Sequence, residues 1–254
     1  MALPRLAIAT TEIELPISKR VVTIRQYRAS EEKALLMVNQ KNQNAVTSAM
    51  MNLIAACCGD SISKDDLSKL SMVDTLYLYT KLNIISVGAE KTIGVTCQNE
   101  EGGKDKDGNV VACKHEVKMK VDLSVIEVSN DGKFDPDVSL GEDTKVSLRL
   151  PTMLEMAGID ASKQEDAAYM FDSIISLLSK CTTQMVINGD FISTKDTNVQ
   201  EIFNWYMDLS HENLQKLVGW YEQIPYLYKT IKWKCSTCGH QNELVIKDIT
   251  SFFH

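Results

Sequence analysis

Two short cysteine elements, one in the middle of the chain and one near its end, carry the residues best suited to chemistry. Each consists of an apolar strand, a cysteine, a turn, a second cysteine, one further residue and a histidine. The residues in these roles are Cys97, Cys113 and His115 in the first element and Cys235, Cys238 and His240 in the second. Two cysteines at the mouth of a turn place both sulfurs on one side, where zinc binds them as thiolates. The repeated pattern therefore predicts two zinc-knuckle-like hairpins.

Together, the two hairpins would supply the four thiolates of a single structural zinc site. The predicted metal ligands are Cys97, Cys113, Cys235 and Cys238. Two alternatives stay open at this point. In one, only the C-terminal pair binds metal, alone or with His240. In the other, all four cysteines are reduced core residues without metal, since free cysteine is often buried.

The first element departs from a standard knuckle in two ways. Its cysteines are separated by the long segment 98–112, and Lys114 stands where the second element has Gly239. Glycine suits that position because the backbone there often adopts positive φ. The shared site therefore requires residues 98–112 to form an exposed hairpin whose base brings the two sulfurs together. The turn signal Asp107-Gly108 lies within this polar segment and favours such a hairpin.

Little else in the sequence suggests catalysis. The chain has four histidines, and it contains no Gly-x-Ser-x-Gly, no phosphate-binding loop and no His-Glu-x-x-His. The acidic residues of 98–112 alternate with lysines and lack the spacing of a calcium loop. The other cysteines end or follow apolar helices and are interpreted as packing residues; they are Cys57, Cys58 and Cys181. We expect a protein that is not an enzyme.

Aromatic residues concentrate near the end of the chain. One interpretation is that they pack the last helices against the terminal hairpin. The other is a partly exposed aromatic face that docks another protein, because such side chains dominate binding hot spots. The candidate partner-binding residues are Trp220, Tyr221, Tyr226, Phe252 and Phe253.

Composition narrows the class of protein further. The 254 residues are 44% hydrophobic and 24% charged, which is ordinary for a globular protein, and the net charge is −7. A diffuse acidic balance argues against general binding to nucleic acid or to anionic membranes. We expect no membrane span and no signal peptide, because no apolar run is long enough. The expected location is the cytoplasm in which the chain is made.

The pattern of apolar residues predicts an α+β fold, in which a helical layer is interrupted by several small antiparallel hairpins. Helices are expected at about 31–41, 43–58, 74–82, 152–158, 165–180, 197–209 and 211–223. Strands or hairpins are expected at about 8–24, 84–97, 113–121, 136–150 and 185–192, and again around the second cysteine pair. Four regions follow, which together would form one compact unit: 1–86 with a hairpin and helices, 87–151 with the cysteine hairpin and short strands, 152–225 with helices, and 226–254 with the terminal knuckle and tail.

Several stretches along the chain resemble the baseplate hub subunits and hub assembly proteins of T-even-type contractile-tailed bacteriophages. These stretches are Met1 to Pro4, Glu12 to Lys19, Ile24 to Leu36, Leu82 to Gly88, Leu148 to Met153 and Ile249 to Phe253. Relatives tend to have Pro-Phe after the first arginine, where this chain has Gln26-Tyr27. Only some relatives have the cysteines, so the resemblance does not itself imply zinc.

The resemblance implies a non-enzymatic structural or chaperone-like role in assembling the hub of a phage tail baseplate. The implied partners are other hub proteins and the tape-measure protein. The implied location is the host cytoplasm, and incorporation into the virion tail stays open.

Two other functions compete with this interpretation. A zinc-ribbon regulator that binds nucleic acid is suggested by the lysines around the second cysteine pair, although the acidic balance opposes it. These lysines are Lys229, Lys232, Lys234 and Lys247. A zinc hydrolase would need an open coordination position for water, which four thiolates would close.

Overall fold

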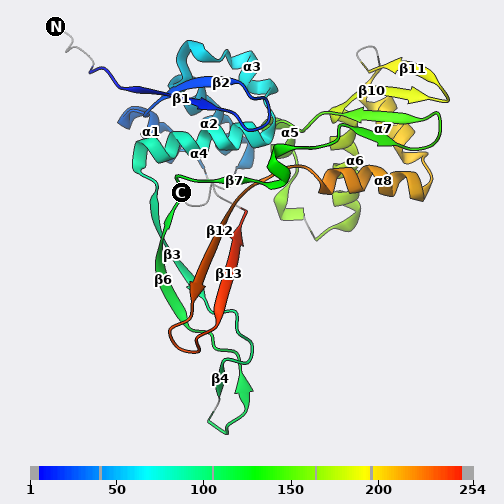
Figure 1. Cartoon of the computed structure of the whole chain (residues 1–254). Coiled ribbons are helices and arrows are strands. Elements are labelled where there is room, and N and C mark those ends of the chain that lie inside the picture. Colours follow the sequence, from blue (N-terminus) through cyan, green and yellow to red (C-terminus); the bar gives the residue numbers. More distant parts are fainter. Residues whose placement is uncertain (1–5, 40–41, 105, 164, 195–196, 248–254) are drawn as a thin grey trace.

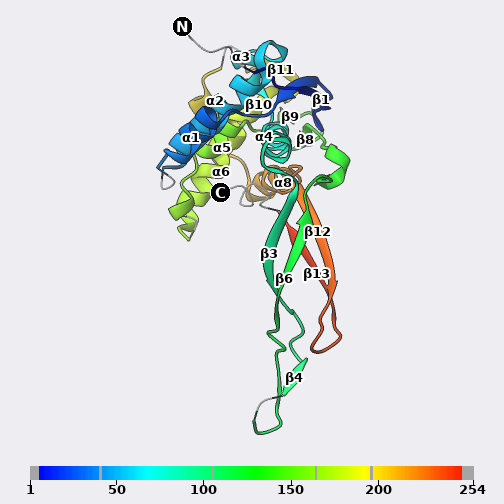
Figure 2. The ribbon, with the colours of Figure 1, turned by 90° about the vertical axis from the view of Figure 1, so that its left-hand side faces the viewer.

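The computed structural model describes residues 6–39, 42–104, 106–163, 165–194 and 197–247. It contains helices and small antiparallel sheets, which confirms the predicted α+β class. Two bodies lie side by side, and a long arm of paired strands extends from them (Figures 1 and 2).

The first body packs a hairpin against helices. Its elements are β1 (Thr10–Glu14), β2 (Val21–Arg25), α1 (Ala29–Leu36), α2 (Gln43–Cys58), the short 3-10 helix η1 (Gly59–Ser61), α3 (Lys64–Lys69) and α4 (Met72–Val87). Helix α2 begins where the Asn42 side chain accepts the Ala45 N–H, and its apolar face is buried at Leu53 and Ile54. The buried carboxylate of Asp74 in α4 accepts N–H groups from the β1–β2 turn, which fixes the hairpin on the helices.

The second body has its own core and a four-stranded sheet in the order β11-β10-β9-β8. Its elements are β8 (Asp137–Ser139), β9 (Lys145–Leu148), α5 (Met153–Ala157), η3 (Ala161–Lys163), α6 (Ala167–Cys181), β10 (Thr182–Ile187), β11 (Asp190–Ser193), α7 (Val199–Met207) and α8 (His211–Glu222). Asn188 and Gly189 both adopt positive φ between β10 and β11, as expected for a two-residue hairpin turn. The predicted strands on either side of Gly141 are β8 and β9.

The arm consists of two long hairpins that run side by side (Figures 1 and 2). One pairs β3 (Glu90–Thr96) with β6 (Glu116–Asp122), and the other pairs β12 (Leu227–Lys234) with β13 (Gln241–Ile246). The remaining elements are β4 (Gly103–Lys104) and β5 (Val110–Val111) at the tip, and β7 (Glu127–Val128) and η2 (Ser129–Gly132) at the base, where β7 pairs with β12. Leu123 is fully buried in a cluster that includes Val121, Ile231 and Trp233, so apolar side chains hold the two hairpins together.

The largest differences from the sequence prediction are at two element boundaries. Residues 84–87 were predicted as the start of a strand, but they form the last turn of α4. The Ser86 hydroxyl donates to the Leu82 carbonyl, and Gly88 ends the helix with positive φ while its N–H bonds the Ile84 carbonyl. The first predicted helix is also shorter than expected, because α1 ends at Leu36.

No helix in the described part of the chain is long and apolar enough to cross a membrane.

Candidate metal centre

The four predicted cysteine ligands meet where the two hairpins of the arm end. Their sulfur atoms all lie within 4.8 Å of one another. The sulfurs of Cys97 and Cys238 lie 3.6 Å apart, and those of Cys113 and Cys235 lie 3.8 Å apart. A tetrahedral ion with metal–sulfur bonds of about 2.3 Å requires sulfurs about 3.8 Å apart. The four side chains are therefore arranged so that they could hold one metal ion.

The same backbone hydrogen bond closes each hairpin at its first cysteine. The Cys97 N–H donates to the His115 carbonyl at 2.8 Å, and the Cys235 N–H donates to the His240 carbonyl at 2.8 Å. Each pair of cysteines thus lies at the mouth of a hydrogen-bonded turn, although the two loops differ greatly in length.

Strands β4 and β5 pair within the segment 98–112, as the shared site requires. The Cys113 N–H donates to the Asn99 carbonyl at 2.8 Å, which closes the base of this tip beside the sulfurs. Gly102 passes so close that a β-carbon there would lie 2.8 Å from the β-carbon of Cys113. The long insertion therefore leaves the cysteine-bearing end of the hairpin intact.

Lys114 takes the backbone conformation that glycine takes in the second element. Its φ is 49°, and φ at Gly239 is 74°. A residue with a side chain adopts this left-handed conformation at a cost of about 1–2 kcal/mol. Lys114 in place of a glycine therefore adds local strain but leaves the geometry of the turn unchanged.

Two asparagine side chains place amide donors beside the sulfurs. The Nδ2 atoms of Asn242 and Asn99 lie 3.6 Å from the sulfurs of Cys97 and Cys238, respectively. Asn242 is only 3% exposed, and its Oδ1 accepts the Gln98 N–H at 2.8 Å. Outer-shell donors of this kind orient ligands and tune a metal site. Sequence reasoning missed both residues, because neither belongs to the cysteine–histidine pattern.

The turn of the second hairpin favours thiolates. Backbone N–H groups lower the pKa of Cys235, and the backbone amide of His240 is the main cause that lowers the pKa of Cys238 to about 6. The backbone amide of His115 lowers the pKa of Cys113, but burial and the three neighbouring thiols outweigh it and raise that pKa to about 12. Four thiols this close share protons, and a bound cation would deprotonate all of them.

The histidines lie outside the cluster of four sulfurs. His115 Nε2 is 3.1 Å from the Ser236 hydroxyl, so its ring links the two hairpins across the turn. His240 contributes its backbone to the turn, and its side chain is exposed. Among the described residues, the cluster that could hold a metal consists of cysteines alone.

The other three cysteines are buried in the two bodies. Burial is the main cause that raises the pKa of Cys57, Cys58 and Cys181 to about 12. They are neutral thiols at pH 7, as their interpretation as packing residues requires.

The candidate partner-binding aromatic residues differ in how far they are exposed. Trp220 is 5% exposed in the second core, and its indole N–H donates to the Asp135 carbonyl. Tyr221 packs against the same core, whereas Tyr226 is 37% exposed with the Lys247 ammonium 4.5 Å from its ring centre. Phe252 and Phe253 lie outside the described residues. Partner binding through these side chains stays a prediction.

Comparison with known proteins gives one match. A family model described as T4 bacteriophage base plate protein matches residues 8–254. No curated protein matches the chain. No solved structure matches it.

Proposed function

The chain belongs to the T4 bacteriophage base plate protein family, and from this membership we propose that it is a non-enzymatic protein that helps to assemble the hub of a tail baseplate. It acts by binding other proteins, either as a permanent structural part or as an assembly chaperone. Its partners are hub proteins and the tape-measure protein. It works in the host cytoplasm during assembly and enters the virion tail if it is a permanent part.

We propose further that the four cysteines bind one structural zinc ion. Four thiolates form a closed coordination sphere, which suits zinc and leaves no position for a reactive water. The ion would tie the hairpin at 90–122 to the hairpin at 227–246, and so stiffen the arm at the end far from the bodies. The observation that carries this proposal is the convergence of the four sulfurs within 4.8 Å.

The arm is the element best suited to reach a partner, because it extends away from both bodies (Figures 1 and 2). Beyond the sulfurs, the β4–β5 tip exposes Val110 by 60% and Val111 by 37%. Among the described strands, no third strand pairs with this two-stranded ladder, so its edges could pair with a strand of another protein. A metal-stiffened base would hold this tip in a fixed direction and reduce the entropy lost on binding.

The experiment is co-purification of the full chain with the hub and tape-measure proteins of the phage that encodes it. The variant Val110→Glu/Val111→Glu should lose capture of the partner while it keeps its fold. Val125→Glu is the matched control, since Val125 is 64% exposed outside the tip. Failure of the wild-type chain to capture any of these proteins would contradict the proposal, and equal loss in both variants would contradict the role of the tip.

The nucleic-acid alternative has less support from the side chains around the second cysteine pair. Lys232 pairs with Glu243 at 3.1 Å, Lys229 donates to the Val125 carbonyl, and Lys247 lies over Tyr226. These contacts engage three of the four lysines that suggested it. Binding to DNA or RNA that weakens steeply with salt would favour this alternative over the assembly role.

A further inference from the structure

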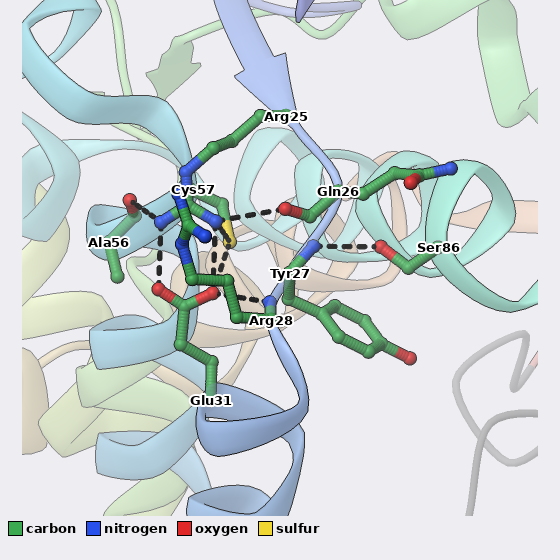
Figure 3. A network of polar contacts seen from close by, with 8 residues as sticks. All are labelled: Arg25, Gln26, Tyr27, Arg28, Glu31, Ala56, Cys57 and Ser86. Atoms are coloured by element: carbon green, nitrogen blue, oxygen red, sulfur yellow. Dashed lines mark hydrogen bonds and ion pairs between the residues drawn. The ribbon is translucent and has the colours of Figure 1, made fainter. Parts of the chain in front are cut away.

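An arginine at the end of β2 joins three separate elements of the first body (Figure 3). The Arg25 guanidinium binds both carboxylate oxygens of Glu31, at 2.9 and 2.7 Å, and donates to the carbonyls of Gln26 and Ala56, each at 2.8 Å. Glu31 also accepts the Arg28 N–H at 2.7 Å, at the start of α1. This clamp connects the end of β2, the first turn of α1 and the last turn of α2.

The second body contains the same clamp. The Arg149 guanidinium binds both carboxylate oxygens of Glu155, at 2.9 and 2.6 Å, and donates to the carbonyls of Leu150 and Lys180. Glu155 also accepts the Thr152 N–H at 2.8 Å, at the start of α5. Each of these five residues lies 124 positions after its equivalent in the first clamp.

The displacement of 124 residues also relates the helices and the buried side chains. Helices α1 and α5 begin at Ala29 and Met153, and helices α2 and α6 begin at Gln43 and Ala167. The side chains before the two long helices, Asn42 and Asp166, both cap them. Buried residues that match at this displacement are Val22 and Val146, Ile24 and Leu148, Leu53 and Leu177, Ile54 and Leu178, and Cys57 and Cys181.

A surface hollow recurs at the equivalent place in each body. One, of about 280 Å³, lies between α1 and α2, and the other, of about 330 Å³, lies between α5 and α6. Every residue that lines the first has its equivalent, 124 positions on, in the lining of the second; Glu31 with Glu155 and Leu53 with Leu177 are two such pairs. Two helix pairs thus pack in the same way although most of their residues differ.

The two hairpins of the arm also correspond to each other, and they lie in contact. In each half of the chain, helices lead into a long hairpin with two cysteines at its turn. Two sulfur contacts run from the first cysteine of one hairpin to the second of the other, in both directions: Cys97 to Cys238 at 3.6 Å, and Cys235 to Cys113 at 3.8 Å. Exchange of this kind is the mark of an isologous contact between two equivalent surfaces.

We infer that the chain is an internal duplication, a fused pair of one unit, and that each arm hairpin is the binding partner of the other. The first unit spans about residues 8–126, and the second spans about residues 132–247. The four-sulfur centre is one contact between the two units, to which each contributes two cysteines. This inference concerns the protein part alone and does not depend on which ion the sulfurs hold.

Matched variants of the two clamps test whether the units are equivalent. Arg25→Met and Arg149→Met should each lower the melting temperature by about 5–10 °C, since each removes a charge-assisted network. Hydrogen exchange should rise in α1 and the end of α2 for the first variant, and in α5 and the end of α6 for the second. Arg20→Met is the control, because Arg20 forms an exposed ion pair with Asp66 and position 144 is a threonine.

Loss of protection in only one unit's clamp, or melting shifts that differ several-fold between the two variants, would overturn the equivalence. If either methionine variant does not fold, the lysine variants at the same positions supply the comparison. They keep the charge and lose the bidentate geometry.

A circular permutant tests whether the chain is a fused pair. It opens the chain between Asn130 and Asp131, which are exposed at the junction of the two units, and joins the native ends through a flexible linker of about 20 residues. The permutant should unfold cooperatively and retain the wild-type circular dichroism. A permutant opened between Gly59 and Asp60, inside the first unit, should be less stable. The reverse order of stability would contradict the inference.

Discussion

Side-chain amides donate hydrogen bonds to two sulfurs of the centre, from Asn242 to Cys97 and from Asn99 to Cys238. Asn242 has the most constrained position of these amide donors, because one side chain bonds both the Cys97 sulfur and the Gln98 backbone. Such a residue sets the orientation of a ligand without binding the metal itself. Its effect should therefore be visible in how tightly and with what geometry the site holds an ion.

We predict that Asn242→Leu weakens metal binding by about 10-fold or more, as loss of an outer-shell partner usually does. The cobalt-substituted protein should also show a shifted sulfur-to-metal charge-transfer band. Glu243→Ala is the control, since Glu243 is the next residue on the same strand and pairs with Lys232 at the surface. Unchanged affinity and an unchanged spectrum would show that the amide does not position the thiolate.

The clamp carboxylates give the fold a pH dependence with a definite sign. Hydrogen bonds from Arg25 are the main cause that lowers the pKa of Glu31 from 4.5 to about 2. Burial raises the pKa of Glu155, but bonds from Arg149 and the Thr152 amide outweigh it and lower that pKa overall. Because the unfolded chain binds these protons more readily, the stability that the clamps contribute is present above about pH 4.5.

We predict that this contribution disappears as the pH falls from about 4.5 towards 2. Urea unfolding of the wild-type chain and of Glu31→Gln at pH 7, 4 and 3 measures it. The difference in unfolding free energy between the two proteins should shrink as the pH falls, and effects of acid on the cysteine centre cancel in that difference. A difference that is constant with pH would show that protonation of Glu31 does not cause the loss of stability in acid.

Among the elements, the arm depends on apolar contact between two thin hairpins as well as on its cysteines. A two-stranded hairpin is marginally stable alone, so the two hairpins need a shared apolar layer or a metal to remain ordered. Leu123 is fully buried in that layer and directly follows β6, where its N–H bonds the Ala89 carbonyl just after α4 ends. The four cysteine sulfurs lie at the opposite end of the two hairpins.

Leu123→Ala should destabilise the chain by about 2–5 kcal/mol, the usual cost of a cavity at a buried leucine. The control Val125→Ala changes an exposed side chain two residues away and should cost about 0.5 kcal/mol or less. Chemical denaturation gives the free energy, and hydrogen exchange should place the loss in β3, β6, β12 and β13. Equal effects of the two substitutions would show that the layer contributes little.

Most elements could be predicted from the sequence, because their signals are local. The turn Asn188-Gly189 and the alternation around Val22 and Ile24 each indicate one structure. The start of β3 could not be predicted in this way. The apolar run from Ile84 to Val87 suits a strand as well as a helix, and α4 continues through it because the preceding turns are already helical.

Across the whole molecule, the convergence of distant cysteines could be predicted, since a repeated pattern with metal-ligand chemistry has few other uses. The duplication of the bodies could not. The equivalent clamps keep an arginine and a glutamate but change the residues between them, Gln26-Tyr27 in one and Leu150-Pro151 in the other. The two clamps resemble each other in long-range contacts, since each arginine donates to a backbone carbonyl 31 residues later. A contact with a backbone carbonyl so far along the chain cannot be recognised from a local sequence pattern.

The two bodies are joined at more than one place. The isolated bridge between Ser71 and Thr152 and the hydrogen bond from Met72 N–H to the Pro151 carbonyl join them directly. The four-sulfur centre joins them again at the end of the arm. We therefore expect metal removal to loosen the arm while both bodies stay folded.

That expectation is checked by hydrogen exchange before and after treatment with a strong chelator. Protection should fall at 97–113 and 235–241 and remain in α2 and α6. Global loss of protection would show that the centre supports the bodies as well.

The most direct measurement is the zinc content per chain of the wild-type protein and of Cys97→Ser, Cys235→Ser and Cys181→Ser, by mass spectrometry of the metal after purification. A shared centre predicts about one zinc per wild-type chain and per Cys181→Ser chain, and a large loss in both of the other variants. Cys97 is 138 residues before Cys235 in the sequence, so its effect on the C-terminal pair can only arise through the fold. Full zinc retention in Cys97→Ser, or a wild-type chain without zinc, would contradict the account.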